Sequence, residues 1–174
     1  MPVTVLIGGA RSGKSALAIR MARAAGTRVA LIATAEPRDA EMAARIARHR
    51  AERPADWATV EEPLDLGTAL TAVVDDDFVV LDCLTLWVSN AMEAGLDDET
   101  IGARAAEHAK VAAARPGGGV VVTNEVGLGI VPAHEVSRRY RDVLGRVNAI
   151  WCDAADEALL LVAGRALRLE RLAR

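Results

Sequence analysis

A glycine-rich segment near the start of the chain has the residue types and the spacing of a phosphate-binding loop. Residues 8–15 read GGARSGKS, and Gly8, Gly13, Lys14 and Ser15 fill the pattern G-x-x-x-x-G-K-[ST]. Glycines let successive backbone N–H groups turn toward phosphate oxygens, and the N-terminus of a following helix adds the positive end of its dipole. We therefore expect Lys14 to contact the β- and γ-phosphates of a nucleoside triphosphate and the Ser15 hydroxyl to bind Mg²⁺.

Two carboxylates follow apolar runs further along the chain, at the ends of predicted strands. Ligands of open parallel sheets gather at this edge. Asp82 ends the run FVVLD and is the expected acidic partner of the metal, with a merely solvated carboxylate as the alternative. Glu125 ends VVVTNE and either orients a nucleophile or caps the following loop, and the sequence leaves both open.

His49 is the least ordinary residue of a predicted helix over residues 37–53. At about 100° per residue, it shares one face of that helix with Met42 and Ile46. An imidazole among guanidinium groups suits anion binding better than core packing, although a partly exposed histidine beside solvated arginines is the alternative. The arginines concerned are Arg45, Arg48, Arg50 and Arg53, which with Arg11 would gather positive charge near one site.

Alternating strands and helices must position these residues. Apolar runs predict strands at residues 3–7, 28–34, 59–61, 78–84, 120–123 and 158–162, the last closing the sheet. Helical spacing and end signals predict helices from residue 15 to about 25, over 37–53 and 64–74, around Trp87, and over about 97–115 and 135–154. This order predicts an α/β fold: a P-loop NTPase-like three-layer sandwich with a mostly parallel central sheet. We assign no role to the basic stretch that starts at Gly164.

Length and composition limit the number of domains and the classes of function. The chain has 174 residues, which predicts one nucleotide-binding catalytic domain over residues 1–174. A net charge of −3 and only 3% aromatic residues argue against a nucleic-acid reader. No apolar stretch approaches the ~18 residues of a membrane span and no signal-peptide pattern is present, which favours a cytoplasmic protein.

Several other side chains have expected structural places. Cys83 and Cys152 lie in apolar runs and are expected to stay reduced. Trp87 and its apolar neighbours form either an interface patch or part of the core. His108 and His134 are expected to be structural.

Five blocks of the sequence resemble the bifunctional adenosylcobinamide kinase and adenosylcobinamide-phosphate guanylyltransferase family of cobalamin biosynthesis. They are VLIGGARSGKS, IAT, DAEMAARIARHRAERPADWATVEEP, VTNEVGLGIVP and YRDVLGRVN, and they span nearly the whole chain. The resemblance implies that ATP or GTP phosphorylates the aminopropanol hydroxyl of adenosylcobinamide. GTP then gives GMP to that phosphate through a covalent GMP–histidine intermediate, releasing pyrophosphate. It also implies a homotrimer, while Mg²⁺ as cofactor is expected from the phosphate-binding pattern.

The resemblance places the family's nucleophile on His49. The phosphate-binding pattern makes Lys14 the second expected catalytic residue, with Ser15 and Asp82 as the expected metal ligands. The resemblance places the nucleotide contacts on Gly8, Gly9, Ala10, Arg11, Ser12, Gly13, Lys14, Ser15, Ala33, Thr34, Ala35, Arg50, Ala51, Glu52, Arg53, Glu61 and Asp82. Two positions depart from the pattern, because Arg48 stands where relatives can have a second histidine and Asp82 where they can have glutamate.

Three other functions are compatible with the motifs. The chain could be a P-loop kinase of another small hydroxyl compound, a nucleotide-switched binding protein, or a guanylyltransferase without kinase activity. Against a GTPase switch, Asn124 is followed by Glu-Val-Gly, so the guanine-reading N-K-x-D pattern is absent.

Overall fold

A computed structural model describes residues 1–51 and 54–172, with the exception of the side chain of Arg45. Its strands are β1 (Val3–Gly8), β2 (Val29–Ala33), β3 (Ala58–Glu61), β4 (Phe78–Asp82), β5 (Gly119–Val122), β6 (Glu157–Val162) and β7 (Arg165–Arg168). Its helices are α1 (Lys14–Ala24), α2 (Ala40–Ala51), α3 (Leu66–Ala72), α4 (Leu84–Glu93), α5 (Asp98–Ala113) and α6 (Glu135–Ala154). The predicted α/β order is confirmed.

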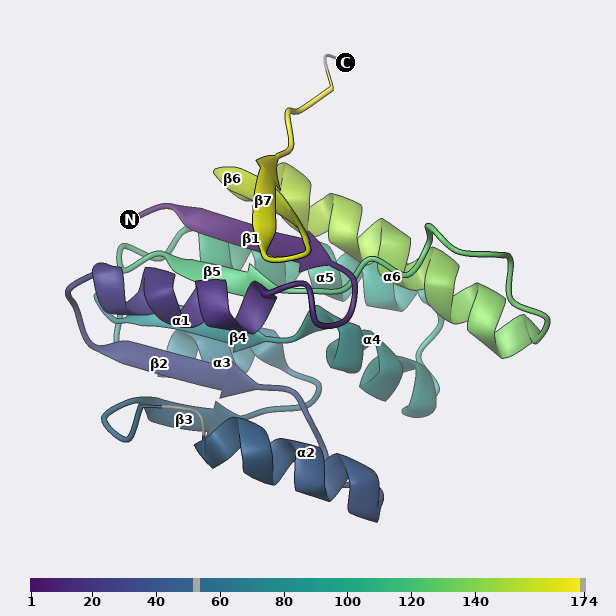
Figure 1. Ribbon diagram of the computed structural model, residues 1–174, viewed down its shortest axis with the longest axis horizontal. Helices are drawn as coiled ribbons and strands as arrows, with labels where there is room; N and C mark the ends of the chain where they lie inside the picture. The colour runs from purple at the N-terminus through teal and green to yellow at the C-terminus, as the bar shows by residue number, and fades with distance from the viewer. Residues whose placement is uncertain (52–53, 173–174) are drawn as a thin grey trace.

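The strands form one sheet of seven, in the order β3-β2-β4-β5-β1-β6-β7 (Figure 1). The pairs among β1 to β6 are all parallel, and only β7 runs antiparallel, against β6. Parallel strands end at the same edge, so the ends of β1, β2, β3, β4 and β5 bring the segments that follow them together. The phosphate-binding loop and Asp82 therefore lie at one edge of the sheet.

Helices cover both faces of the sheet, which explains the continuous apolar runs in its central strands. Val3 and Val5 face a core shared with α3, α4, α5 and α6, whereas Leu6 faces a second core built with α1. Figure 1 shows α1 in front of the sheet and α3, α5 and α6 behind it. The result is the predicted three-layer sandwich.

The edge of the sheet differs from the prediction. The strand at residues 157–162 does not close the sheet, because β7 pairs with β6 through a hairpin centred on Ala163 and Gly164. Both turn residues have positive φ, at 50° and 75°, as a two-residue turn that matches strand twist requires. All of β7 is exposed, so the burial pattern that reveals inner strands is missing from its sequence.

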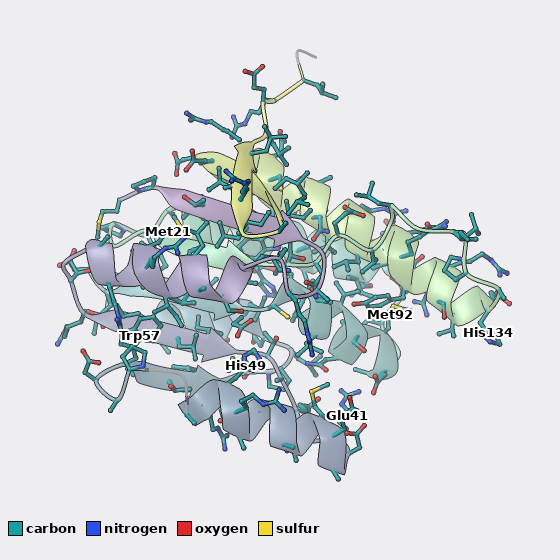
Figure 2. The ribbon with its side chains drawn as sticks, viewed as in Figure 1. Met21, Glu41, His49, Trp57, Met92 and His134 are labelled. Atoms are coloured by element: carbon teal, nitrogen blue, oxygen red, sulfur yellow. The ribbon has the colours of Figure 1, made fainter. Side chains whose placement is uncertain are left out.

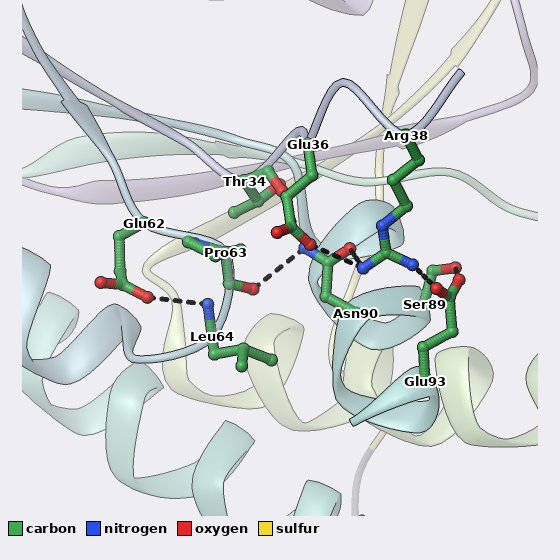
Figure 3. A network of polar contacts seen from close by, with 9 residues as sticks. All are labelled: Thr34, Glu36, Arg38, Glu62, Pro63, Leu64, Ser89, Asn90 and Glu93. Carbon is green, nitrogen blue, oxygen red and sulfur yellow. Dashed lines mark hydrogen bonds and ion pairs between the residues drawn. The ribbon is translucent and has the colours of Figure 1, made fainter. Parts of the chain in front are cut away.

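Polar contacts hold the start of helix α2, which carries His49, and the segment that leads into it. Asp39 caps it by accepting a hydrogen bond from the Met42 amide at 2.6 Å. Just before it, Arg38 donates to the side-chain oxygen of Asn90 at 2.9 Å and pairs with Glu93 of α4 (Figure 3). The Asn90 amide in turn donates to the Thr34 carbonyl at 2.8 Å, so α4 holds the segment between β2 and α2.

The core accounts for the residues whose place the sequence left open. Trp87 is fully buried, and its indole N–H donates to the Leu64 carbonyl at 2.8 Å, so it is a core residue and not an interface patch. His108 packs edge-on against it, with ring centroids 5.5 Å apart. Cys83 and Cys152 are both free thiols. No helix in the described part of the chain is long and apolar enough to cross a membrane.

Candidate active site

The phosphate-binding loop joins β1 directly to α1. Gly8 is the last residue of β1, and Lys14 is the first residue of α1. The Lys14 ammonium donates to the carbonyls of Gly8 at 2.8 Å and Gly9 at 2.7 Å. These contacts hold its charge at the mouth of the loop. Ser15 follows on the exposed first turn of the helix, where a hydroxyl can reach a ligand at the helix N-terminus.

Burial lowers the pKa of Lys14 below its ordinary value, while Cys83 and Asp82 act in the opposite direction. The carboxylate of Asp82 therefore lies close enough to favour the charged ammonium. This interaction links the loop after β1 to the end of β4, two strands away in the sheet.

The hairpin between β6 and β7 supports the other side of the loop. The Gly164 amide donates to the Ser12 carbonyl at 2.9 Å, and a Cβ on Gly13 would lie 3.3 Å from the Gly164 Cα. A Cβ on Gly8 would collide with the carbonyl oxygen of Leu161. The glycines of the motif thus allow close packing against this hairpin, in addition to the turn that phosphate binding requires.

His49 points from α2 toward the sheet (Figure 2). It lines a small hollow of 60 Å³ together with Ala35, Met42, Ile46, Asp82, Cys83 and Leu86. The predicted face of Met42, Ile46 and His49 is therefore the face that packs inward. The His49 Nδ1 lies 3.8 Å from a carboxylate oxygen of Asp82, and both side chains are partly exposed. An imidazole is thus placed next to a carboxylate, with access to solvent.

The end of β4 that carries Asp82 is held by a buried hydroxyl. Thr34 is fully buried, and its hydroxyl donates to the Cys83 carbonyl at 2.8 Å and accepts from the Cys83 amide at 2.9 Å. Burial, and secondarily Asp82, raises the pKa of the Cys83 thiol to about 11. The thiol is therefore protonated near neutral pH and is no competing nucleophile beside His49.

The predicted magnesium ligands have suitable chemistry. Ser15 offers a hydroxyl and Asp82 a carboxylate, both hard oxygen donors of the kind that Mg²⁺ prefers. Among residues 1–51 and 54–172, no group of three acidic, histidine or cysteine side chains could hold a metal alone. Mg²⁺ ordinarily binds one or two protein oxygens together with substrate phosphates and water, so this donor set fits an ion that arrives with a nucleotide.

A second hollow lies at the end of α2, against β3. It has a volume of 520 Å³ and is lined by Arg50, Ala51, Pro54, Ala55, Trp57, Thr59 and Glu61. Arg50 forms an ion pair with Glu61, so its charge is balanced there, and both Arg48 and Arg50 are exposed. Glu52 and Arg53 lie outside the described residues.

The other predicted contacts fall around these two hollows and the loop. Ala33 ends β2, Ala35 lines the histidine hollow, and Gly9, Ala10 and Arg11 are the exposed part of the phosphate-binding loop. Arg11 has a φ of 57°. Glu125 belongs to the same edge of the sheet, because its amide donates to the Gly8 carbonyl at 3.2 Å. Its carboxylate accepts from the Gly127 amide at 2.5 Å, which caps the following loop.

Sequence reasoning missed two contributors to this geometry. The first is Gly164, whose only sequence signal is an Ala-Gly pair between two short alternating segments. The second is the proximity of Asp82 to His49, which depends on where α2 lies against the sheet and has no signal in the spacing of residues.

The sequence matches a known family model and is similar to curated proteins. Residues 4–169 match the family model CobU, described as cobinamide kinase / cobinamide phosphate guanyltransferase. The chain is 42% identical to the bifunctional adenosylcobalamin biosynthesis protein CobP of Pseudomonas aeruginosa, over 95% of this chain and 96% of that protein. It is 39% identical to CobU of Salmonella typhimurium, over 95% and 98% of the two chains.

Solved structures of other proteins share the fold. The RadB recombinase covers 91% of this chain and 73% of its own length, with a TM-score of 0.52 at 17% identity. An ATPase of a bacterial type III secretion system covers 92% of this chain and 51% of its own, with a TM-score of 0.54 at 12% identity. At these identities the likeness concerns the fold alone.

Proposed function

Because the chain belongs to the cobinamide kinase / cobinamide phosphate guanyltransferase family, we propose that it catalyses both reactions within one domain. In the first, ATP or GTP phosphorylates the hydroxyl of adenosylcobinamide. In the second, GTP supplies GMP to the new phosphate, giving adenosylcobinamide-GDP and pyrophosphate. The family match favours neither a nucleotide switch nor a kinase of an unrelated hydroxyl compound.

The position of Asp82 is the observation that carries this proposal. Its carboxylate lies 3.8 Å from His49 and also favours the charged form of Lys14. One side chain thus connects the phosphate-binding loop with the nucleophile. A triphosphate held by the loop would have the imidazole near its phosphates, which is the arrangement that two successive transfers at one nucleotide site require.

The chain's residues would divide the chemistry as follows. Lys14 and the amides of the loop hold the β- and γ-phosphates and stabilise the charge that develops on them. The neutral imidazole of His49 attacks the α-phosphorus of GTP; a phosphorus–nitrogen bond forms and the bond to the departing pyrophosphate breaks. The substrate phosphate oxygen then attacks the same phosphorus and releases His49, so one displacement becomes two. Mg²⁺, held by Ser15 and Asp82, would neutralise phosphate charge.

The histidine assignment is tested by covalent labelling. Wild-type protein incubated with α-labelled GTP and Mg²⁺, then denatured, should retain label that is lost in acid and stable in alkali. His49→Ala should retain none. It should still convert adenosylcobinamide and ATP to adenosylcobinamide phosphate, because Lys14 and the loop are intact.

A different experimental result would contradict each part of the proposal. Label retained by His49→Ala would remove the histidine from the mechanism. Wild-type protein that takes up label but forms no adenosylcobinamide phosphate would be a guanylyltransferase without kinase activity.

A further inference from the structure

The loop between β5 and α6 exposes large aliphatic side chains at the edge of the sheet that carries the nucleotide site. We call residues 126–131 the apolar loop; its large side chains are Val126, Leu128, Ile130 and Val131. Leu128 is 85% exposed and Ile130 is 97% exposed. Contiguous aliphatic exposure of this kind is typical of a binding surface.

The base of this loop is fixed beside the phosphate-binding loop. The Glu125 amide donates to the Gly8 carbonyl at 3.2 Å. The Asn124 carbonyl accepts from the buried side chain of Asn148 at 3.0 Å, and the Asn124 amide donates to the Thr85 hydroxyl at 2.9 Å. Residues from β1, α4 and α6 thus hold the point where the apolar loop leaves the sheet.

Hydrogen bonds also hold the C-terminal end of the apolar loop. The Arg138 guanidinium of α6 donates to the carbonyls of Pro132 at 3.0 Å and Ala133 at 2.6 Å. In Figure 1 the loop runs between the end of β5 and the start of α6, on the side of the molecule where α4 lies. The apolar loop is therefore fixed at both ends, while its aliphatic side chains are exposed.

A hollow next to α6 extends this surface. Val136, in the first turn of α6, is 65% exposed and lines a hollow of 220 Å³ between α4 and α6. Met92 and Tyr140 form other parts of its wall. Figure 2 shows Met92 between α4 and α6, with His134 at the far end of the loop. Val136 thus joins the apolar loop to a hollow whose wall also contains the polar residues Ser89, Glu93 and Ser137.

We propose that the apolar loop and this hollow bind the corrin ring of the acceptor, an inference that rests on the proposed function. Only the hydroxyl arm of adenosylcobinamide has to reach Lys14 and the γ-phosphate. The macrocycle is far larger than the arm, so it must lie outside the phosphate-binding loop, and its methyl groups suit contact with aliphatic side chains. The apolar loop follows Glu125, whose amide donates to the Gly8 carbonyl, and it supplies such side chains.

Leu128→Ser and Ile130→Ser test this assignment separately. Each change removes an aliphatic contact with the ring in both ground and transition states, so the KM for adenosylcobinamide in the kinase reaction should rise by about tenfold with kcat preserved. Equilibrium dialysis, followed by the visible absorbance of the corrinoid, should show the same loss of binding. Labelling of His49 by GTP in the absence of corrinoid should equal that of the wild type.

Leu172→Ser is the matched control. Leu172 is 91% exposed and follows β7, whose end pairs with the start of β6 at the opposite edge of the sheet. This variant should leave the KM for the corrinoid unchanged.

Three results would overturn the proposal. The first is unchanged corrinoid binding in both loop variants that still label with GTP. The second is a change of their sedimentation to that of a smaller species, which would make the loop a contact between copies of this chain. The third is wild-type protein that labels with GTP but neither binds nor phosphorylates adenosylcobinamide, which would remove the proposed function as well.

Discussion

Asp82 stands between His49 and Lys14 at the centre of the candidate site. A carboxylate oxygen of Asp82 lies 3.8 Å from the His49 Nδ1. The same carboxylate favours the charged form of Lys14. A single residue can thus serve phosphoryl transfer by binding the metal and guanylyl transfer by orienting the imidazole.

Neutralising Asp82 should therefore impair both reactions. We expect Asp82→Asn to lower the rate of His49 labelling and the kinase kcat by about 10- to 100-fold, in the range seen when outer partners of metal sites or catalytic groups are removed. Asp82→Glu keeps the charge and should retain most of both. The measurements are single-turnover labelling with GTP and steady-state phosphorylation of adenosylcobinamide. Equal rates in Asp82→Asn and wild type would mean that the carboxylate serves neither reaction.

The motif residues were predictable from sequence because their chemistry depends on local spacing. Gly8, Gly13, Lys14 and Ser15 are recognised by their spacing between a strand and a helix, and the shared face of Met42, Ile46 and His49 follows from helical periodicity. The pairing of Arg50 with Glu61 and the approach of Asp82 to His49 could not be predicted, since both depend on how α2 lies against the sheet.

At the scale of elements, the β6–β7 hairpin is the main difference from the sequence-based expectation. Inner strands can be recognised in a sequence by their continuous apolar runs, but all four residues of β7 are exposed. Its alternating Arg and aliphatic residues resemble a solvated tail. What identifies it in the structure is the turn, in which Gly164 supports the phosphate-binding loop through Ser12.

This support should be measurable at Gly164. Gly164→Ala places a Cβ in open space but at a φ of 75°, so the strain should lower the free energy of unfolding by about 1 kcal/mol. Because the strained turn contacts Ser12, we also expect the KM for the nucleoside triphosphate to rise. Urea unfolding and kinase kinetics measure the two effects.

Gly26→Ala is the control for strain alone. Gly26 follows α1, with a φ of 70° and no atom near the position of a Cβ. It should lose about the same stability with an unchanged KM for the nucleotide. If Gly164→Ala behaves identically, the hairpin has no influence on the loop.

At the scale of the whole molecule, the core contains a histidine whose protonation opposes folding. Burial lowers the pKa of His108 below its ordinary value, against a smaller opposite effect of Asp65. The unfolded chain therefore binds a proton at a higher pH than the folded chain does. The stability from this residue is complete above about pH 6.5 and decreases as the pH falls through the unfolded value toward the folded one.

A variant without the titrating His108 side chain should have a Tm that depends less on pH. His108→Phe keeps a ring against Trp87 and cannot bind a proton, so its Tm should fall less than that of the wild type between about pH 7.5 and about pH 5.5. Scanning calorimetry at the two pH values gives the comparison. A drop in Tm of the same size in both proteins would place the acid sensitivity in other groups.

The order of strands in the sheet has a consequence for synthesis of the protein. β1 pairs with β5 and β6, which follow it by more than one hundred residues in the chain, and the turn that supports its loop comes later still. During translation β1 therefore cannot pair with β5 and β6 until most of the chain has left the ribosome, and its hydrogen-bonding edges stay unpaired until then. The phosphate-binding loop that follows β1 is therefore one of the last parts of the molecule to reach its final structure.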